Sequence, residues 1–158
     1  MIFHFSDFPP IEIQANSKGI TSLTFDTSSP KLPESEREKL FIQQAQLELA
    51  EYFCQKRKSF SVPLSLQTGT IFQQKVWQAL LAIPYGETRS YQEIATLIDS
   101  PKAVRAIGQA NKKNPLAIFI PCHRVIGKNG QLTGYMGAHA HSLSVKHKLL
   151  QLEKTADF

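Results

Sequence analysis

Cysteine and long apolar runs are both scarce in this chain of 158 residues. The only two cysteines, Cys54 and Cys122, could pair, but a reducing cytosol disfavours a disulfide. We expect Cys54 to be a buried small hydrophobe, because it follows a helix-like segment with apolar neighbours. No stretch approaches the roughly 20 apolar residues of a membrane span. The first residues lack the charged-then-apolar pattern of a secretory signal, so we expect a cytoplasmic protein that does not bind membranes.

Acidic residues are absent from a long stretch in the second half of the chain. Residues 101–152 contain eight Lys and Arg and no Asp or Glu, whereas residues 1–65 are nearly neutral, with seven basic and eight acidic residues. The net charge of +5 therefore comes from the second half. Such a stretch attracts polyanions, which makes nucleic acid the leading partner. A solvated basic surface without a partner remains the alternative.

The first part of the chain has the pattern of a small α/β domain. Residues 11–13 and 20–25 alternate as strands do, and residues 16–19 between them have turn chemistry, so we expect a hairpin. Residues 34–55 have apolar positions at helical spacing and acids in the first turn. Residues 56–68 show no clear period, and we place a domain boundary there, giving domains 1–65 and 66–158.

The second part begins with signals for several short helices. Thr70 with Gln73, and Ser90 with Glu93, match capping boxes. Ser100 is expected to be the N-cap of a further helix over residues 102–111. Two short helices with so short a connection suggest a helix-turn-helix whose second helix enters DNA, although a plain helical hairpin has the same spacing.

Cys122 is the candidate nucleophile. Residues 116–120 form an apolar run that we expect to be a buried strand or extended segment leading to Cys122, and Asn129-Gly130 predicts a hairpin between residues 124–126 and 131–133. A thiol has a pKa of about 8.5, so a nucleophilic cysteine needs a base or nearby cations. His123 and Glu153 are candidates for the base and for the group that orients it. A lone Cys-His pair also occurs in purely structural roles.

Several motifs in order resemble the O6-alkylguanine-DNA alkyltransferase family. The resemblance covers residues 70–153 and rests on the segments 72–77, 83–86, 88–95, 104–108, 111–115 and 120–125, the last reading IPCHRV. It implies an α+β protein in which a small ribonuclease H-like α/β domain precedes a mostly helical winged-helix alkyltransferase domain. Residues 1–65 match the family only in general plan.

The resemblance also implies roles for five residues. Cys122 would accept the alkyl group irreversibly, once per molecule, after activation through a water held by His123. Glu153 would orient His123, and Asn114 would hold the active-site turn by hydrogen bonds. Tyr91 would crowd the 3′ phosphate and donate to the base. No cofactor is implied.

The implied partner is double-stranded DNA containing O6-alkylguanine. In the family the helix-turn-helix enters the minor groove and rotates the damaged nucleotide out of the stack. Arg105 resembles the finger that fills the gap left by the flipped base. Positions that touch the DNA backbone in relatives are occupied here by Gln92, Ser100 and Lys128. A monomer is our default expectation.

The chain departs from the family pattern after Tyr135, where the loop to the last helix is about four residues longer. Tyr135 is expected to line the substrate pocket. Met136 stands where relatives have a small residue, so it is expected to narrow that pocket. His139 and His141 invite a metal site with Cys122 and His123, but their spacing does not match common zinc motifs, and we expect no metal.

Two other functions remain open at the level of sequence. A module that recognises alkylated guanine without removing the group is one, but such relatives lack a cysteine at the position of Cys122. A cysteine hydrolase is the other, and it explains neither the acid-free half of the chain nor the helix-turn-helix pattern.

Overall fold

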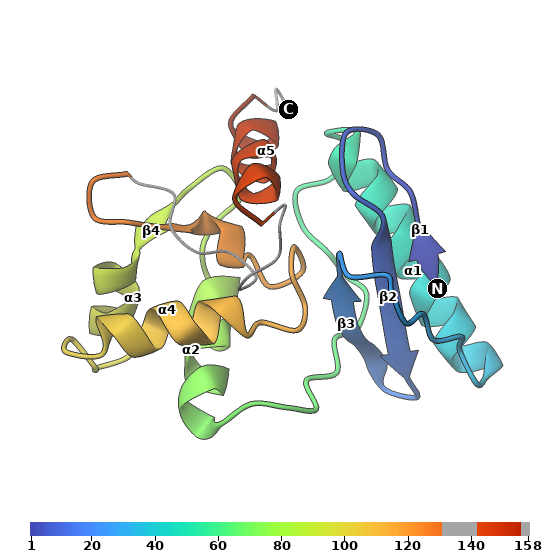
Figure 1. The fold of residues 1–158 in the computed structure, drawn as a ribbon, viewed down its shortest axis with the longest axis horizontal. Coiled ribbons are helices and arrows are strands. Elements are labelled where there is room, and N and C mark those ends of the chain that lie inside the picture. The colour runs from blue at the N-terminus through green and yellow to red at the C-terminus, as the bar shows by residue number, and fades with distance from the viewer. Residues whose placement is uncertain (131–141, 156–158) are drawn as a thin grey trace. The chain divides into compact units, whose positions relative to one another are not determined.

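The computed structural model describes residues 1–130 and 142–155. The chain divides into two compact units, which change over between residues 67 and 68. The first unit combines a small sheet with one long helix, and the second is mostly helical (Figure 1). This arrangement confirms the expected α+β class. No described helix is both long enough and apolar enough to span a bilayer.

The first unit contains a three-stranded antiparallel sheet. Its strands are β1 (Ile2–Phe3), β2 (Ile11–Asn16) and β3 (Gly19–Thr24), in the order β1-β2-β3. The Asn16 side chain closes the β2–β3 turn, because its Oδ1 accepts hydrogen bonds from the backbone N–H of Lys18 and Gly19 at 2.8 and 3.2 Å. The predicted hairpin is therefore confirmed. Strand β1 was not anticipated, since two residues carry too little periodicity to detect.

Helix α1 (Glu36–Phe53) is shorter than the predicted range of 34–55. It begins after Ser35, whose Oγ accepts from the Glu38 N–H at 3.3 Å. The backbone turns left-handed at Gln55, with φ of 60°, which a continuing helix does not allow. Cys54, which was expected to be buried, is exposed, and two leucines of the helical apolar spacing, Leu40 and Leu47, are 64% and 60% exposed.

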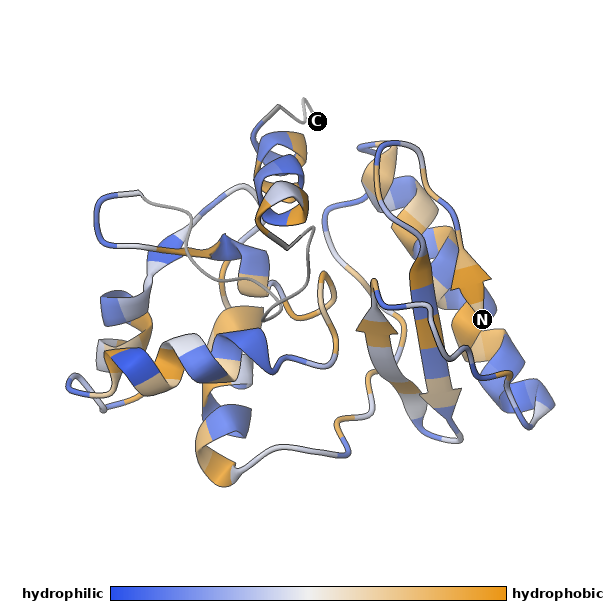
Figure 2. Ribbon diagram, viewed as in Figure 1, coloured by the Kyte–Doolittle hydropathy of each residue, from blue (hydrophilic) through white to orange (hydrophobic). Residues whose placement is uncertain are grey.

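One face of α1 packs on the sheet. The side chains on that face are buried by this contact, whether they are apolar or polar. Hydrophilic and hydrophobic positions alternate around the helix in Figure 2. The buried positions are Ile42, Ala45, Glu48, Leu49 and Tyr52. Glu48 is tolerated there because its carboxylate accepts hydrogen bonds from the backbone N–H of Ser61 and Val62.

Three helices that pack on one another begin the second unit: α2 (Ile71–Leu81), α3 (Tyr91–Leu97) and α4 (Val104–Lys112). Both predicted capping boxes are present, with Thr70 and Ser90 as the N-caps of α2 and α3. Trp77 of α2 is buried and its Nε1–H donates to the carbonyl of Ala110 in α4 at 2.9 Å. Val76 and Leu80 of α2 are buried with it, whereas Leu81 is 42% exposed.

The connection between α3 and α4 differs from the predicted one. Helix α4 begins at Val104 with Ala103 as its N-cap, and no side chain caps it. Ser100 therefore does not cap α4; its carbonyl instead accepts from the Ala103 N–H at 2.9 Å within the turn. Gln92 of α3 braces the same turn, donating to the carbonyl of Pro101 at 3.0 Å. The pair is a helix-turn-helix with a longer turn than expected.

The segment after α4 is a tight buried turn rather than the predicted strand. The Ile120 N–H donates to the carbonyl of Leu116 at 2.8 Å, and Ile118 has a φ of 74°, which is strained for a β-branched residue. Residues 116–120 are all buried, as their apolar pattern predicted, but the predicted strand conformation was wrong.

The chain then forms the short 3₁₀ helix η1 (Cys122–Arg124) and β5 (Val125–Ile126), which pairs in parallel with β4 (Arg89–Ser90). A turn follows, in which the Gly130 N–H donates to the carbonyl of Gly127 at 2.9 Å. The second arm of the predicted hairpin, residues 131–133, lies outside the described residues. Helix α5 (Ser142–Thr155) ends the described chain and contacts η1.

Candidate active site

Cys122 lies at the start of η1 and is fully buried. Its N–H donates to the carbonyl of Ile120 at 2.7 Å. Asn114 holds this turn from both sides: its Nδ2 donates to the carbonyl of Ile120 at 2.8 Å, and its Oδ1 accepts from the Leu116 N–H at 2.9 Å. The geometry agrees with the expectation that Asn114 fixes the turn that carries Cys122.

A buried ion cluster stands next to Cys122 in the sequence and in space. Glu153 of α5 accepts from His123 Nε2 at 2.7 Å and from the Arg124 guanidinium through Nη2 at 2.7 Å and Nε at 2.9 Å. Arg124 Nη1 also donates to the carbonyl of Ile83 at 2.8 Å. The His123–Glu153 contact expected from the sequence is present. The helical turn of η1, rather than an extended strand, directs His123 toward α5.

The cluster determines which ring nitrogen of His123 carries the proton. Burial alone would raise the pKa of Glu153, but His123 and Arg124 together hold it well below its usual range. An ionised carboxylate only accepts hydrogen bonds, so the facing Nε2 of His123 carries a hydrogen. Burial lowers the pKa of His123, which favours the neutral ring and leaves Nδ1 as an acceptor. His123 is therefore arranged as a base at Nδ1.

A buried lysine links Cys122 to Tyr91. Lys146 of α5 has no exposed surface, and its Nζ donates to the carbonyl of Val125 at 2.5 Å. The same Nζ lies 3.5 Å from the Tyr91 hydroxyl and 5.7 Å from the centre of its ring. Burial lowers the pKa of Lys146 to about 8, and the charge of Cys122 partly opposes this shift. Lys146 therefore provides a cation within the electrostatic range of the thiol.

The residues expected to contact DNA are at or near the surface of the second unit. Arg105 on α4, Gln92 on α3 and Lys128 after β5 are exposed, and Tyr91 and Ser100 are half-buried. Tyr135 and Met136, expected to line the substrate pocket, lie outside the described residues, as do His139 and His141. Within residues 1–130 and 142–155, no three His, Cys, Asp or Glu residues gather as metal ligands do.

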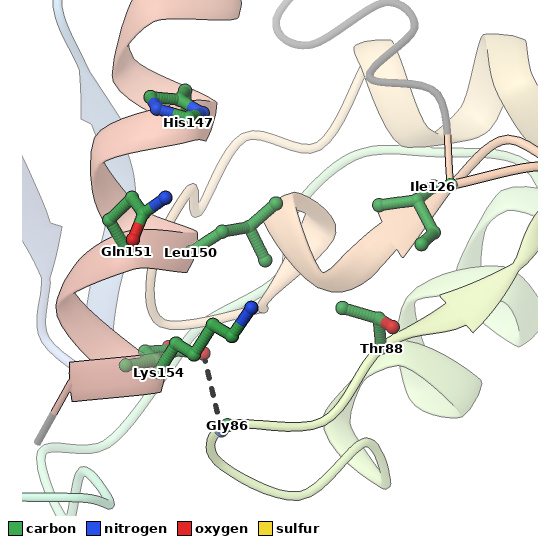
Figure 3. A pocket seen from close by; sticks show the side chains of 9 residues that line it. Gly86, Thr88, Ile126, His147, Leu150, Gln151 and Lys154 are labelled. Carbon is green, nitrogen blue, oxygen red and sulfur yellow. Dashed lines mark hydrogen bonds between the residues drawn. The ribbon is translucent and has the colours of Figure 1, made fainter.

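A pocket of about 440 Å³ lies between α5 and the segment that leads into β4 (Figure 3). His147, Leu150 and Lys154 line it from α5, and Gly86 lines it from the facing loop. The Gly86 N–H donates to Glu153 Oε2 at 3.4 Å, drawn as the dashed line in Figure 3. Glu153 also lines this pocket, whereas neither Cys122 nor Tyr91 is among its described lining residues.

Comparison with known proteins identifies the family. Residues 71–155 match the model of the 6-O-methylguanine DNA methyltransferase DNA-binding domain, and residues 3–66 match the ribonuclease-like domain of the same proteins. The chain belongs to the O6-methylguanine DNA methyltransferase family. The expected order of a ribonuclease-like domain followed by a DNA-binding domain is thereby confirmed.

Individual relatives of this methyltransferase family support the assignment. A methylated-DNA–protein-cysteine methyltransferase of Methanosarcina mazei is 47% identical over 98% of both chains. The constitutive enzyme of that name from Bacillus subtilis is 61% identical over 70% of this chain, a match that spans 65% of the relative. An O6-methylguanine methyltransferase structure from Mycobacterium tuberculosis superimposes with a TM-score of 0.84 at 40% identity, covering 100% of this chain and 96% of that one. A further Mycobacterium tuberculosis structure, 44% identical with a TM-score of 0.80 over 93% of this chain and 88% of that one, was solved in complex with DNA.

Three residues of this methyltransferase site were not assigned their structural roles from the sequence. Arg124 pairs with Glu153, a contact that its place two residues after Cys122 does not indicate. Lys146 could have been noticed, because it stands two helical turns before Glu153 on the apolar face of α5. Asn111, fully buried on α4, donates from Nδ2 to the carbonyl of Cys122 at 3.2 Å. No pattern in the sequence signals that contact.

Proposed function

We propose that this chain repairs O6-alkylguanine in double-stranded DNA by transferring the alkyl group irreversibly to Cys122. One observation carries the proposal: a fully buried cysteine adjoins a histidine whose Nε2 faces a buried carboxylate, in a member of the methyltransferase family. This is the arrangement that an activated thiol nucleophile requires.

The reaction is a displacement at carbon. The thiol proton of Cys122 passes through a water to His123 Nδ1, and Glu153 stabilises the resulting imidazolium. The sulfur forms a bond to the alkyl carbon as the bond from that carbon to guanine O6 breaks. Tyr91 donates a proton to the departing guanine, and Lys146, 3.5 Å from the Tyr91 hydroxyl, supports that donation. The thioether is a poor leaving group, so each molecule reacts once.

Lys146 contributes a second effect through its charge. It is buried close to Cys122, where a cation favours the thiolate over the thiol. Arg124 contributes less to this effect, because its charge is paired with the carboxylate of Glu153. The nucleophile is therefore supported by a base on one side and by a buried ammonium group on the other.

DNA binding follows from the burial of Cys122. A base inside a duplex cannot reach a buried thiol, so the damaged nucleotide must leave the stack. We assign the helix-turn-helix to the minor groove, with Arg105 of α4 filling the gap that the base leaves. The backbone contacts are assigned to Tyr91 and to three further polar residues: Gln92, Ser100 and Lys128. The protein acts as a monomer in the cytoplasm, where the thiol stays reduced.

The decisive experiment measures the intact mass of the protein after incubation with a duplex containing O6-methylguanine. We expect a gain of one methyl group per molecule, located on Cys122 and absent from Cys122→Ala. Cys54→Ala is the matched control and should react as the native chain does, although Cys54 is the exposed cysteine. Tight lesion-selective binding without a mass gain would instead support a recognition module.

The DNA-binding assignment is tested separately with Arg105→Ala. This variant should react with the free base O6-benzylguanine at the native rate, because Arg105 is exposed on α4 and outside the buried cluster. Its single-turnover rate on duplex DNA should fall, because the flipped base loses the side chain that replaces it. Equal loss on both substrates would contradict the assignment.

A further inference from the structure

Two buried polar atoms beside Cys122 have no hydrogen-bond partner among the described residues. They are Oδ1 of Asn111 and Nδ1 of His123. Both side chains are completely buried. An unsatisfied polar atom in a protein interior is costly, and such atoms are usually satisfied by ordered water or have a role in the chemistry of a site.

The two atoms belong to side chains anchored at the same peptide group. Asn111 Nδ2 donates to the carbonyl oxygen of Cys122, and that carbonyl carbon is bonded to the backbone nitrogen of His123. The position of Asn111 is itself fixed, because the preceding carbonyl, that of Ala110, accepts the indole N–H of Trp77. Asn111 is therefore held at the link between the nucleophile and its base.

Both atoms are acceptors, so they cannot satisfy one another. Oδ1 of Asn111 is a carbonyl oxygen, since its amide nitrogen is the donor to Cys122. His123 Nδ1 lacks a hydrogen, since Nε2 donates to the ionised Glu153. A water molecule has two O–H donors, and one water can satisfy both acceptors.

We propose that Asn111 and His123 together hold one buried water beside Cys122, and that Asn111 is a positioning residue for proton transfer. The inference rests on the proposed function and adds the second ligand of the water. The thiol proton moves to the water oxygen while one water hydrogen moves to His123 Nδ1. The other water hydrogen stays hydrogen-bonded to Asn111 Oδ1, which keeps a lone pair of the water oxygen directed at the thiol.

The water itself is tested by a high-resolution crystal structure of the native protein without DNA. The expected result is one ordered water within about 3.2 Å of both Asn111 Oδ1 and His123 Nδ1. A water bound to His123 alone, or none at this position, overturns the proposal. This measurement does not depend on how any variant folds.

The role of the water is tested with Asn111→Leu, which has a similar volume and lacks both polar atoms. Gln109→Ala, an exposed position on the same helix, is the matched control. At pH 7 the maximal single-turnover rate of Asn111→Leu should fall about 10- to 100-fold, with an unchanged half-saturating DNA concentration. Without the proton path, the variant depends on spontaneous ionisation of the thiol, so its rate should rise toward that of the native protein as the pH is raised.

The outcomes separate this inference from the proposed function. A loss of equal size at every pH indicates structural damage and overturns the positioning role, as does a native rate at pH 7. In both cases a methyl gain on Cys122 of the native protein would leave the proposed function standing. No methyl gain on the native protein would refute the function itself.

Discussion

The burial of Lys146 should make the stability of the protein depend on pH between 7 and 10. Its pKa is lowered from 10.5 to about 8 in the folded chain. Because the unfolded chain holds this proton up to a higher pH, the folded state is penalised most fully below pH 8 and is relieved as the pH rises toward 10.5. In Lys146→Met, which fills the same space without a charge, this contribution is absent. Relative to that variant, the native protein should gain about 2 to 3 kcal/mol between pH 7 and pH 10.

The measurement is urea unfolding of both proteins at several pH values in that interval, with Cys122→Ala as the common background so that the thiol does not titrate. Removing the charge of Cys122 lowers the pKa of Lys146 further, so the gain in this background should be at least as large. At pH 7 the methionine variant is stabilised because it buries no charge, and it is destabilised because it lacks the hydrogen bond to the carbonyl of Val125. The test is therefore the change with pH in the difference between the two unfolding free energies, not the sign of that difference at pH 7. A difference in unfolding free energy that does not change with pH would refute the assignment of a lowered pKa to Lys146.

Three further predictions concern the second unit. Glu153→Gln leaves the buried guanidinium of Arg124 without its counter-charge, so urea unfolding should show a loss of about 3 to 5 kcal/mol. Because the pKa of Glu153 is lowered by folding, its contribution is present above the ordinary carboxyl pKa of about 4.5 and should disappear in an acid titration below it. Gly69→Ala should lower Tm sharply, since a Cβ there would lie 2.5 Å from the Trp77 ring at a φ of 103°. A Cβ at Gly108 meets no atom within 4 Å, so Gly108→Ala should stabilise α4 by about 0.5 to 1 kcal/mol. The same variant should bind DNA more weakly in a fluorescence titration, because Gly108 shares a helix face with Arg105.

Local signals in the sequence were sufficient for several elements. The capping boxes at Thr70 and Ser90 begin helices where predicted, because the contacts that make a cap lie within four residues. The β2–β3 hairpin is likewise specified by the residues of its own turn. The order of motifs around Cys122 identified the family, and Glu153 was correctly predicted to contact His123.

Predictions failed where distant parts of the chain decide the outcome. The apolar spacing of α1 allows more than one buried face, and the sheet selects the face that leaves Leu40 in solvent. Residues 116–120 have the pattern of a strand, but none of the strands in residues 1–130 pairs with them, and hydrogen bonds from the Asn114 side chain hold them in a turn instead. The turn before α4 was assigned to a Ser100 cap because a serine followed by proline also suits that position.

The sequence by itself determined the family and predicted the nucleophile, because the motifs that carry both are short and contiguous. Only the tertiary structure decided how the nucleophile is supported. Lys146 and Asn111 stand 24 residues after and 11 residues before Cys122, and their effects depend on burial and on hydrogen bonds across elements. Such contacts cannot be predicted from the separation of residues along the chain. The low dielectric that strengthens the interactions of a buried charge exists only once the core has formed.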